Sequence, residues 1–383
     1  MYIHIGRVGA SNLQACLKNH LQHCGMHSQD ILLHLGKLSG DLLQVALEKL
    51  ETPVDLLVAG PPCPPWSTLG SRECNKDVRA QVFWRILIWV FYLVQCGGLL
   101  AVCIENVVGT IQRQGGRQPC MQMFLQLCRV FIPQFAWRID KLRLMDYKVP
   151  HNRCRVFLRG VRKIVCSSVP APLAPWGQRM LRDVLGKHPP IQRKSLTHVQ
   201  QANLRAYELE IRCKVANGKM QTSDVAVFAV DRTLPKDGGI YGATISKNYV
   251  PTLTCHNRYL FVASVGDVVA RRADSEREFF RFLCGSERIC LQGFRKELAL
   301  DLDPSCQLKT SGNAYPVPLM VAVLQPVVAA LASFDLSSWP SSDAIAAGLS
   351  AKQQVQQRQF ERKLKRKPPL VPLQSARKLR RRS

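Results

Sequence analysis

Apolar runs and amphipathic segments alternate along the chain up to about residue 163. Four segments have the length and apolar content expected of strands: Val54–Ala59, Leu99–Ile104, Trp137–Leu144 and Val156–Val161. Four others space their apolar residues as a helix does: Asn12–Cys24, Leu42–Leu50, residues 79–95 and Met121–Val130. This alternation predicts an α/β domain built on a largely parallel sheet.

The pattern changes after a proline-rich stretch around Pro170–Pro175, which indicates a boundary. A polar helix near 197–212 and short strand candidates predict a smaller mixed domain; the strand candidates are Val225–Val230, Thr252–Thr254 and Leu260–Ala263. Residues 315–333 are predicted to form a helix that returns to the first domain. We therefore divide the chain into residues 1–165, 176–290, 291–334 and a tail over 335–383.

Two apolar stretches are long enough to be considered as membrane spans. Ile86–Ile104 runs nineteen residues without a charge, but Gly97-Gly98 interrupts it. Val317–Phe334 is also uncharged, and two prolines interrupt it. Both are therefore expected to be buried elements of a soluble protein, with no membrane as partner.

The charge is strongly positive, because 53 Lys and Arg face 27 Asp and Glu, a formal net charge of +26. Such a surplus predicts a polyanionic partner, and nucleic acid first. Residues 351–383 hold twelve Lys or Arg and only one acidic residue, arranged mainly in two basic clusters. The tail is expected to be disordered and to act as a bipartite signal for a nuclear import receptor, or as a nonspecific phosphate-binding arm. We expect the protein in the nucleus.

The fifteen cysteines are scattered and form no C-x-x-C pair. This distribution predicts free thiols in a reducing compartment and no metal site.

One cysteine stands apart because of its surroundings. The apolar run Val54–Ala59 leads into Gly-Pro-Pro-Cys63-Pro-Pro-Trp66-Ser67. Prolines fix the backbone around Cys63 without adding donors, and ligands of open α/β sheets bind at the carboxyl ends of strands. Cys63 is therefore a candidate nucleophile rather than one more buried thiol.

Two further features lie at strand ends. Glu105 closes a second apolar run, and adjacent strands of one sheet would bring Glu105 and Cys63 to the same edge. Arg153 and Arg155 lead into the strand candidate Val156–Val161. Their i, i+2 spacing predicts that both point to one face, where they could hold a phosphate or a carboxylate.

Taken in chain order, these pieces resemble the cytosine-C5 DNA methyltransferase family. The Pro-Cys63 loop resembles its nucleophile motif, Glu105-Asn106-Val107 its Glu-Asn-Val motif, and His151-Asn-Arg153-Cys-Arg155 its Gln-x-Arg-x-Arg motif with His in place of Gln. Four later or neighbouring stretches also match: Asp77–Phe83, Val250–Thr254, Arg277–Gly293 and Gly312–Pro318. The resemblance covers roughly residues 8–332.

The resemblance implies a Rossmann-like, S-adenosylmethionine-dependent methyltransferase sheet over residues 1–165 and a target-recognition region within 176–290. Cys63 would add to C6 of a flipped cytosine, and C5 would then accept the methyl group. Glu105 would donate a proton or hydrogen bond to the base, and Arg153 and Arg155 would hold the base or its phosphate. The chemistry requires no metal.

The resemblance also implies a cofactor site. Its expected residues are Asp41, Leu42, Pro62, Val82 and Asn313. The family's Asp-x-Phe-x-Gly-x-Gly loop has no counterpart before Asp41, and Ala10-Ser11 stands where the family has an acidic residue for the ribose. We therefore expect the first strand and its Gly-rich loop to be missing, in an N-terminally incomplete product.

Three interpretations remain open. The first is a DNA cytosine-C5 methyltransferase. The second is a catalytically silent, DNA-binding homologue that keeps the fold. The third is a tRNA cytosine methyltransferase, but the Cys-Phe-Thr signature of that branch is absent, which favours DNA over RNA.

Overall fold

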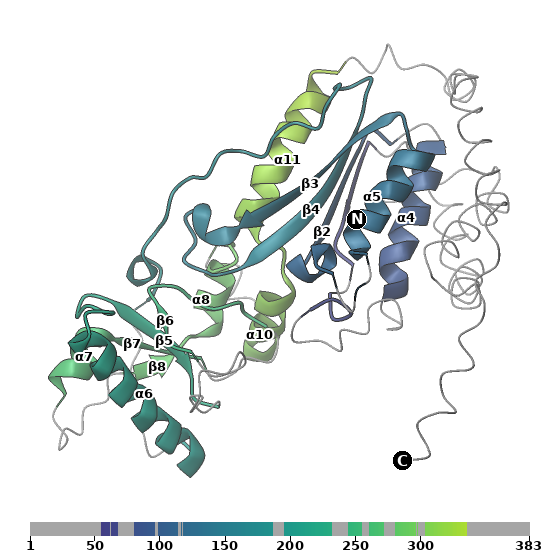
Figure 1. Ribbon diagram of the computed structural model, residues 1–383. Coiled ribbons are helices and arrows are strands. Elements are labelled where there is room, and N and C mark those ends of the chain that lie inside the picture. The colour runs from purple at the N-terminus through teal and green to yellow at the C-terminus, as the bar shows by residue number, and fades with distance from the viewer. Residues whose placement is uncertain are drawn as a thin grey trace, which may run out of the picture.

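The computed structural model describes residues 55–61, 63–67, 80–95, 99–113, 116, 118–186, 195–231, 244–254, 260–271, 280–295, 297 and 303–334. The predicted helices Asn12–Cys24 and Leu42–Leu50, the tail, and the candidate cofactor residues Asp41, Leu42 and Pro62 lie outside these residues. Two four-stranded sheets organise the described part (Figure 1).

The first sheet has the strand order β1-β2-β4-β3. Its strands are β1 (Leu56–Ala59), β2 (Ala101–Asn106), β3 (Phe135–Arg143) and β4 (Cys154–Arg162). All four strand predictions are confirmed to within a few residues. The α/β class is confirmed as well.

The predicted direction of the strands was wrong. β1 and β2 are parallel, but β2 pairs antiparallel with β4, and β4 pairs antiparallel with β3. After β3 the chain turns back through residues 144–153, where the Leu144 amide donates to the Arg153 carbonyl at 2.9 Å. Apolar patterning reports that a strand is buried but carries no information on its direction, so a mixed sheet was not distinguished from a parallel one.

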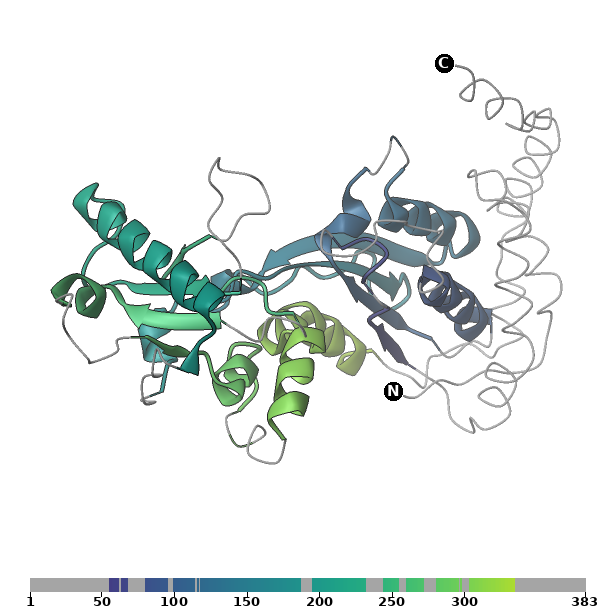
Figure 2. The same ribbon diagram turned by 90° about the horizontal axis from the view of Figure 1, so that it is seen from below.

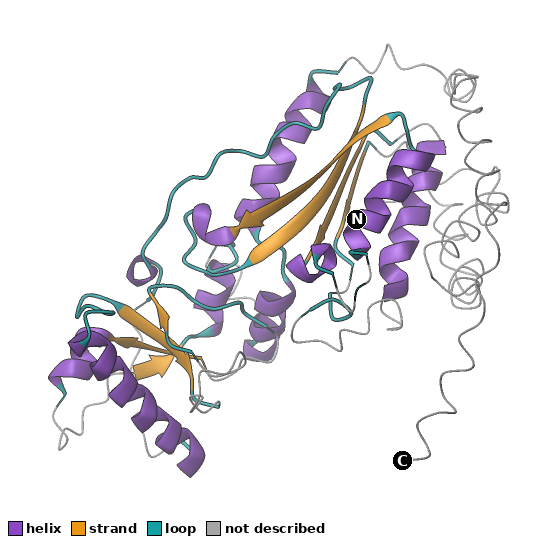
Figure 3. Ribbon diagram, in the orientation of Figure 1, coloured by secondary structure: helices purple, strands orange, loops and turns teal. Residues whose placement is uncertain are grey.

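Helices cover both faces of the first sheet (Figure 3). α4 (Ala80–Gln95) and α5 (Cys120–Phe131) bury one face with Leu57, Ile104 and Leu158. α11 (Val317–Ala332) packs on the other face against Cys103 and Phe157. These helices match the predictions for residues 79–95, Met121–Val130 and 315–333.

A buried ion pair fastens α11 to the sheet. Arg159 of β4 is fully buried and donates to Asp140 of β3 at 2.6 and 2.9 Å. Its remaining Nη1 donates to the Val323 carbonyl of α11 at 3.1 Å. A buried charge is costly without a partner, so a shift of α11 that broke these hydrogen bonds would be unfavourable. The network therefore fixes the position of α11 on the sheet.

The second sheet is antiparallel, with the order β6-β5-β7-β8. Its strands are β5 (Val225–Ala229), β6 (Ser246–Lys247), β7 (Leu260–Ser264) and β8 (Phe280–Phe282). α6 (His198–Ala216) packs on it through Tyr207, whose ring stacks on Phe228 at 4.8 Å, and α7 (Val265–Ala270) follows β7. Figure 2 shows this unit at one end of the described part, with α4 and α5 at the other.

The predicted strand Thr252–Thr254 was wrong. Residues 251–254 form no strand; instead they lie against the loop before β4, with Thr252 Oγ1 donating to the Asn152 carbonyl at 2.6 Å. Residues 250–254 thus make their hydrogen bonds with the loop that contains Asn152, and not with a neighbouring strand.

α8 (Gly285–Cys290) and α10 (Pro304–Asn313) carry the chain from the second sheet back to α11. Within the described residues, no single helix has both the length and the apolar character of a membrane span. The pair α10 and α11 meets those criteria jointly, with a bend of 46° between them.

Candidate active site

The loop after β1 holds Cys63 in a closed turn. The Cys63 carbonyl accepts from the Trp66 and Ser67 amides at 3.0 and 2.9 Å. Trp66 is buried, and its ring packs 5.0 Å from that of Phe83 in α4. The Cys63 side chain is half-buried. The loop is therefore anchored on both sides of a thiol that remains reachable.

Glu105 lies at the same edge of the sheet, as the strand-end argument predicted. β1 and β2 run parallel with Ala59 opposite Ile104, so the loops that follow the two strands begin at the same edge of the sheet. Asn106 joins the two loops, because its Nδ2 donates to the Pro61 carbonyl at 3.3 Å. The structure thus brings the predicted nucleophile loop and the predicted acid together.

Arg155 holds the Glu105 carboxyl. Its Nε lies 2.7 Å from Glu105 Oε1, and both side chains are about nine-tenths buried. In the sheet Glu105 is opposite Phe157, so Arg155, two residues earlier on β4, shares its face. Burial raises the pKa of Glu105, and the positive charges of Arg155 and Arg153 oppose that rise. The pair makes a fixed carboxyl whose proton affinity is higher than that of an ordinary glutamate.

Arg153 donates to backbone carbonyls from three places in the chain. Its terminal nitrogens donate to the carbonyls of Leu253, Gly312 and Ala314 at 3.0 to 3.4 Å. Burial and Arg155 lower its pKa to about 9, while Glu105 and Cys63 favour its charge. Its Nε is buried and has no hydrogen-bond partner among the residues that the structure describes. Arg153 therefore ties the segments from the second sheet and from α10 to the active-site edge, with one free donor.

His151 performs a similar joining function. It is fully buried, its Nδ1 lies 2.9 Å from the Leu291 carbonyl, and its Nε2 accepts from the Leu253 amide at 3.1 Å. A carbonyl partner requires the proton on Nδ1, and an amide partner requires a bare Nε2. Burial, together with Arg153 and Arg155, lowers the pKa of His151 to about 3. The ring is thus a neutral link between three segments.

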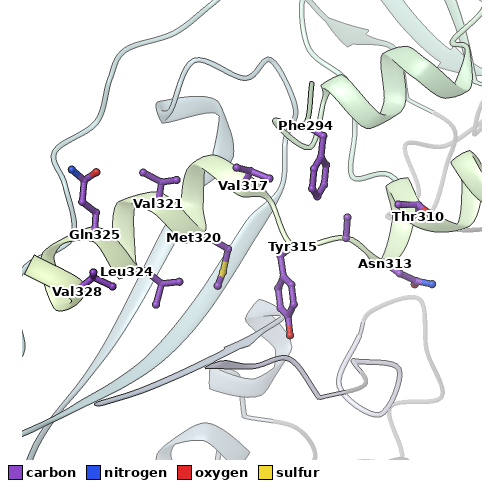
Figure 4. Close-up of a pocket in the computed structure, with 11 residues that line it drawn as sticks. Phe294, Thr310, Asn313, Tyr315, Val317, Met320, Val321, Leu324, Gln325 and Val328 are labelled. Atoms are coloured by element: carbon purple, nitrogen blue, oxygen red, sulfur yellow. The ribbon is translucent and has the colours of Figure 1, made fainter. Parts of the chain in front are cut away.

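A cavity of about 760 Å³ opens beside α11 (Figure 4). Apolar side chains form most of its wall, with Thr310, Asn313 and Gln325 as the polar ones; the apolar ones are Phe294, Ala314, Tyr315, Val317, Met320, Val321, Leu324 and Val328. Asn313 was a predicted cofactor residue. Val82, another, is half-buried in the first turn of α4 and does not line this cavity.

Tyr315 joins this cavity to the active-site edge, and sequence reasoning missed it. A Cβ added to Gly60, at the end of β1, would fall on the Tyr315 hydroxyl and ring. Burial and the nearby Glu105 raise the pKa of Tyr315 to about 12. Tyr315 belongs to the Gly312–Pro318 stretch, but only the close approach to Gly60 reveals where its ring lies.

All ten cysteines in the described part of the chain are free thiols. Within the same residues no group of three or more His, Cys, Asp or Glu side chains could hold a metal ion.

Comparisons with known proteins add an independent finding. The model of the C-5 cytosine-specific DNA methylase family matches residues 32–329. The orphan methyltransferase M.Rho11sI of Bacillus phage rho11s is 30% identical over 145 residues, 37% of this chain and 25% of that protein. The type II methyltransferase M.DsaV of Dactylococcopsis salina is 22% identical over 294 residues, 76% of this chain and 73% of that protein. The match thus spans about a quarter of the phage protein's length.

Two solved structures are similar at low identity. The Entamoeba histolytica methyltransferase EhMeth has a TM-score of 0.42 at 13% identity, covering 71% of this chain and 78% of that one. The S. pombe Dnmt2 methyltransferase has a TM-score of 0.42 at 15% identity, covering 73% and 79%.

Proposed function

The chain belongs to the C-5 cytosine-specific DNA methylases, whose methyl donor is S-adenosylmethionine, and from this premise we propose that it methylates C5 of cytosine in DNA. Cys63 is the proposed nucleophile and Glu105 the proposed acid. One observation carries the proposal: a half-buried thiol on a fixed loop shares a sheet edge with a buried Glu105–Arg155 pair.

The reaction uses these groups in sequence. The Cys63 thiolate forms a bond to C6 of the cytosine, and the electrons of the C5–C6 double bond become available at C5. The bound donor supplies an electrophilic methyl group. Once C5 carries it, loss of the C5 proton to a base restores the C5–C6 double bond and expels the Cys63 thiolate. A base in a stacked duplex is not accessible to Cys63, so the substrate cytosine must be flipped out.

Glu105 offsets the charge that addition creates. Attack at C6 builds negative charge on the ring, and a proton or hydrogen bond from Glu105 to the base nitrogen stabilises it. Burial favours the protonated carboxyl, and Arg155 fixes its orientation at 2.7 Å. Arg155 therefore acts on the base through Glu105, which refines its predicted role as a direct clamp.

The cavity beside α11 does not by itself fit the donor. S-adenosylmethionine carries a charged amino-acid arm and two ribose hydroxyls, whereas the lining of this cavity is almost wholly apolar and holds no charged side chain. Of the predicted donor residues that the structure describes, Asn313 lines the cavity and is exposed, and Val82 does not line it. We therefore assign no part of the donor to this cavity, apart from the predicted contact with Asn313.

The test is transfer of a radiolabelled methyl group from S-adenosylmethionine to duplex DNA and, separately, to tRNA. The proposal predicts incorporation into DNA that is lost in Cys63→Ala and reduced about 10²-fold or more in Glu105→Gln. Transfer to tRNA alone would establish the RNA alternative. DNA binding that weakens with salt, without any transfer, would identify a silent homologue.

We also propose that the basic tail over residues 351–383 binds phosphates, as an arm on DNA or as a nuclear import signal. The two relatives matched by sequence, M.Rho11sI and M.DsaV, come from a phage and a bacterium, neither of which has a nucleus, so they favour the arm. Deleting the tail should weaken DNA binding and lower its dependence on salt concentration, and a tail fused to a fluorescent protein tests import.

A further inference from the structure

Helix α6 carries apolar residues on two sides. One side packs on the second sheet through Leu204, Tyr207 and Ile211. The other side, which we call the outer face, consists of small or apolar residues: Val199, Ala202, Ala206, Leu209, Cys213 and Ala216. These six recur at alternating steps of three and four residues, so they lie within an arc of about 100° on the helix, nearly opposite the packed side.

The outer face is open to solvent. Val199 is 67% exposed and Leu209 65%, more than any other large apolar side chain in the described part of the chain. Ala202, Cys213 and Ala216 are exposed as well. In Figure 1, α6 lies on the outside of the second sheet, at the end of the described part away from α4 and α5. Single exposed apolar side chains are ordinary, but a row of them along one helix face is typical of an interaction surface.

The spacing of the outer face suits a second helix. Alternating steps of three and four residues are the spacing with which two α-helices pack side by side in a coiled coil. Val199 and Leu209 supply the larger contacts, and the alanines between and after them allow the two backbones to approach closely.

The charges along the borders of the outer face indicate which helix fits. Arg205 lies on one border and Glu210 on the other. If two copies of α6 run parallel, Arg205 of each copy lies beside Glu210 of the other, because residues five apart on these borders meet across a parallel coiled coil. An antiparallel pair would instead bring Arg205 of one copy towards Arg212 of the other. The helix has three basic and two acidic residues, so it is nearly neutral in a chain of formal net charge +26.

We propose that α6 is a self-association surface, on which two copies of this chain pair their outer faces in a parallel, two-fold arrangement. The association is weak and reversible, because one pair of helices of this length buries less than the roughly 1,200 Å² at which standard protein–protein interfaces begin. The surface does not include the Cys63–Glu105 edge, so the inference does not depend on the proposed methyl transfer.

Sedimentation velocity of the full chain over a range of concentrations measures the dimer Kd. The salt concentration should be about 0.15 M, where the repulsion between the net charges of two copies is screened beyond about 8 Å. Val199→Glu places a charge in the outer face and should raise the Kd by about 10-fold or more. Val130→Glu makes the same change at an exposed valine of α5 and should leave the Kd unchanged. Thermal melts would confirm that each variant is folded.

Exchange of the border charges tests the parallel arrangement. Arg205→Glu and Glu210→Arg each place like charges beside one another twice per dimer, and each alone should raise the Kd by about 5-fold or more. An equimolar mixture of the two variants restores both pairs of opposite charge and should associate as the wild type does. An antiparallel pair predicts the reverse for Arg205→Glu, because the new carboxylate would face Arg212 of the other copy.

Cys213 reports the direction of pairing in the wild-type chain. Among the cysteines that the structure describes, it is the exposed one, and in a parallel pair it faces its own counterpart across the two-fold axis. Oxidation by copper(II)–phenanthroline, which accepts the two electrons, should therefore join two chains through a Cys213–Cys213 disulfide that mass spectrometry identifies and that Cys213→Ser lacks. In an antiparallel pair centred on the outer face, the two Cys213 residues would lie about 16 Å apart along the helix axis, too far for a disulfide.

The outcomes are distinct. Association that Val199→Glu weakens, that the mixture of charge variants restores and that Cys213 traps supports the proposal. A folded wild-type chain that stays monomeric up to about 100 μM overturns it. Association that Val199→Glu leaves unchanged would place the interface elsewhere, and tighter association of Arg205→Glu would make the pair antiparallel; either result refutes the proposed arrangement.

Discussion

His151 gives the most quantitative prediction for stability. Its ring is fully buried, donates from Nδ1 to the Leu291 carbonyl and accepts at Nε2 from the Leu253 amide. Protonation of Nε2 in the folded state would break its hydrogen bond with the Leu253 amide and place a charge in the core. The pKa of His151 is therefore lowered from 6.5 to about 3. Replacement by glutamine keeps one donor and one acceptor but removes the titration.

Proton linkage gives the direction in which the unfolding free energy changes with pH. As pH falls below 6.5, the unfolded chain takes up a proton at this position and the folded chain does not, until pH approaches 3. Stability is therefore complete above pH 6.5 and declines as pH falls towards 3. At pH 5.5 the unfolded histidine is protonated about ten to one, which stabilises the unfolded state by about 1.4 kcal/mol. At pH 7.5 the same contribution is about 0.1 kcal/mol.

Urea unfolding of the full chain at pH 7.5 and 5.5 measures this difference. The wild type should lose about 1.4 kcal/mol more than His151→Gln between the two pH values, whatever the other titrating groups contribute to both. His198→Gln, a change at an exposed histidine that begins α6, is the matched control and should follow the wild type. Equal losses in the wild type and His151→Gln would refute the neutral, doubly hydrogen-bonded ring.

Further changes test the ion pairs. Arg155→Met leaves the Glu105 carboxyl buried without its partner. The unfolding free energy, measured by urea titration, should therefore fall by about 3 kcal/mol. The initial rate of methyl transfer should fall by about 10²-fold or more. Arg159→Leu breaks the contacts with Asp140 and Val323, so the unfolding free energy should fall by about 3 kcal/mol, yet the folded variant should keep the wild-type Kd for S-adenosylmethionine in calorimetry. A wild-type rate in the Arg155 variant, or a changed Kd in the Arg159 variant, would contradict these assignments.

The sequence located the chemistry better than the connections around it. Cys63 and Glu105 each follow an apolar run, and the rule that ligands gather at strand ends was enough to place them at one edge. The strands of the first sheet were predicted to within a few residues for the same reason, since burial leaves a clear apolar pattern, whereas the predicted strand Thr252–Thr254 is a loop. Strand direction leaves none, so the antiparallel pairing of β4 with β2 and β3 had to come from the structure.

The hydrogen-bond partners of Arg153 and Arg155 could not be predicted from the sequence. Arg153 and Arg155 have the same spacing whether they hold a phosphate, a carboxylate or backbone carbonyls. Only the fold brings Leu253, Gly312 and Ala314 to Arg153, and Glu105 to Arg155. The residue numbers separating these partners range from 50 to about 160, and no local pattern encodes contacts at such separations.

The contact between Tyr315 and Gly60 could not be predicted from the sequence either. In the sequence it is one residue of a motif whose asparagine attracts attention, and Gly60 is one glycine before two prolines. The close approach of the two is a property of the folded chain alone.

The proposed function depends on a covalent bond between Cys63 and a cytosine in DNA, and that bond can be trapped. Fluorine at C5 cannot leave as a proton does, so a duplex carrying 5-fluorocytosine should remain attached to Cys63 once the methyl group has been transferred. We expect a denaturation-resistant protein–DNA adduct that requires S-adenosylmethionine and that mass spectrometry maps to the Cys63 peptide. Cys63→Ala should not form it. A folded chain that binds both the duplex and the donor and yields no adduct would contradict the proposed function.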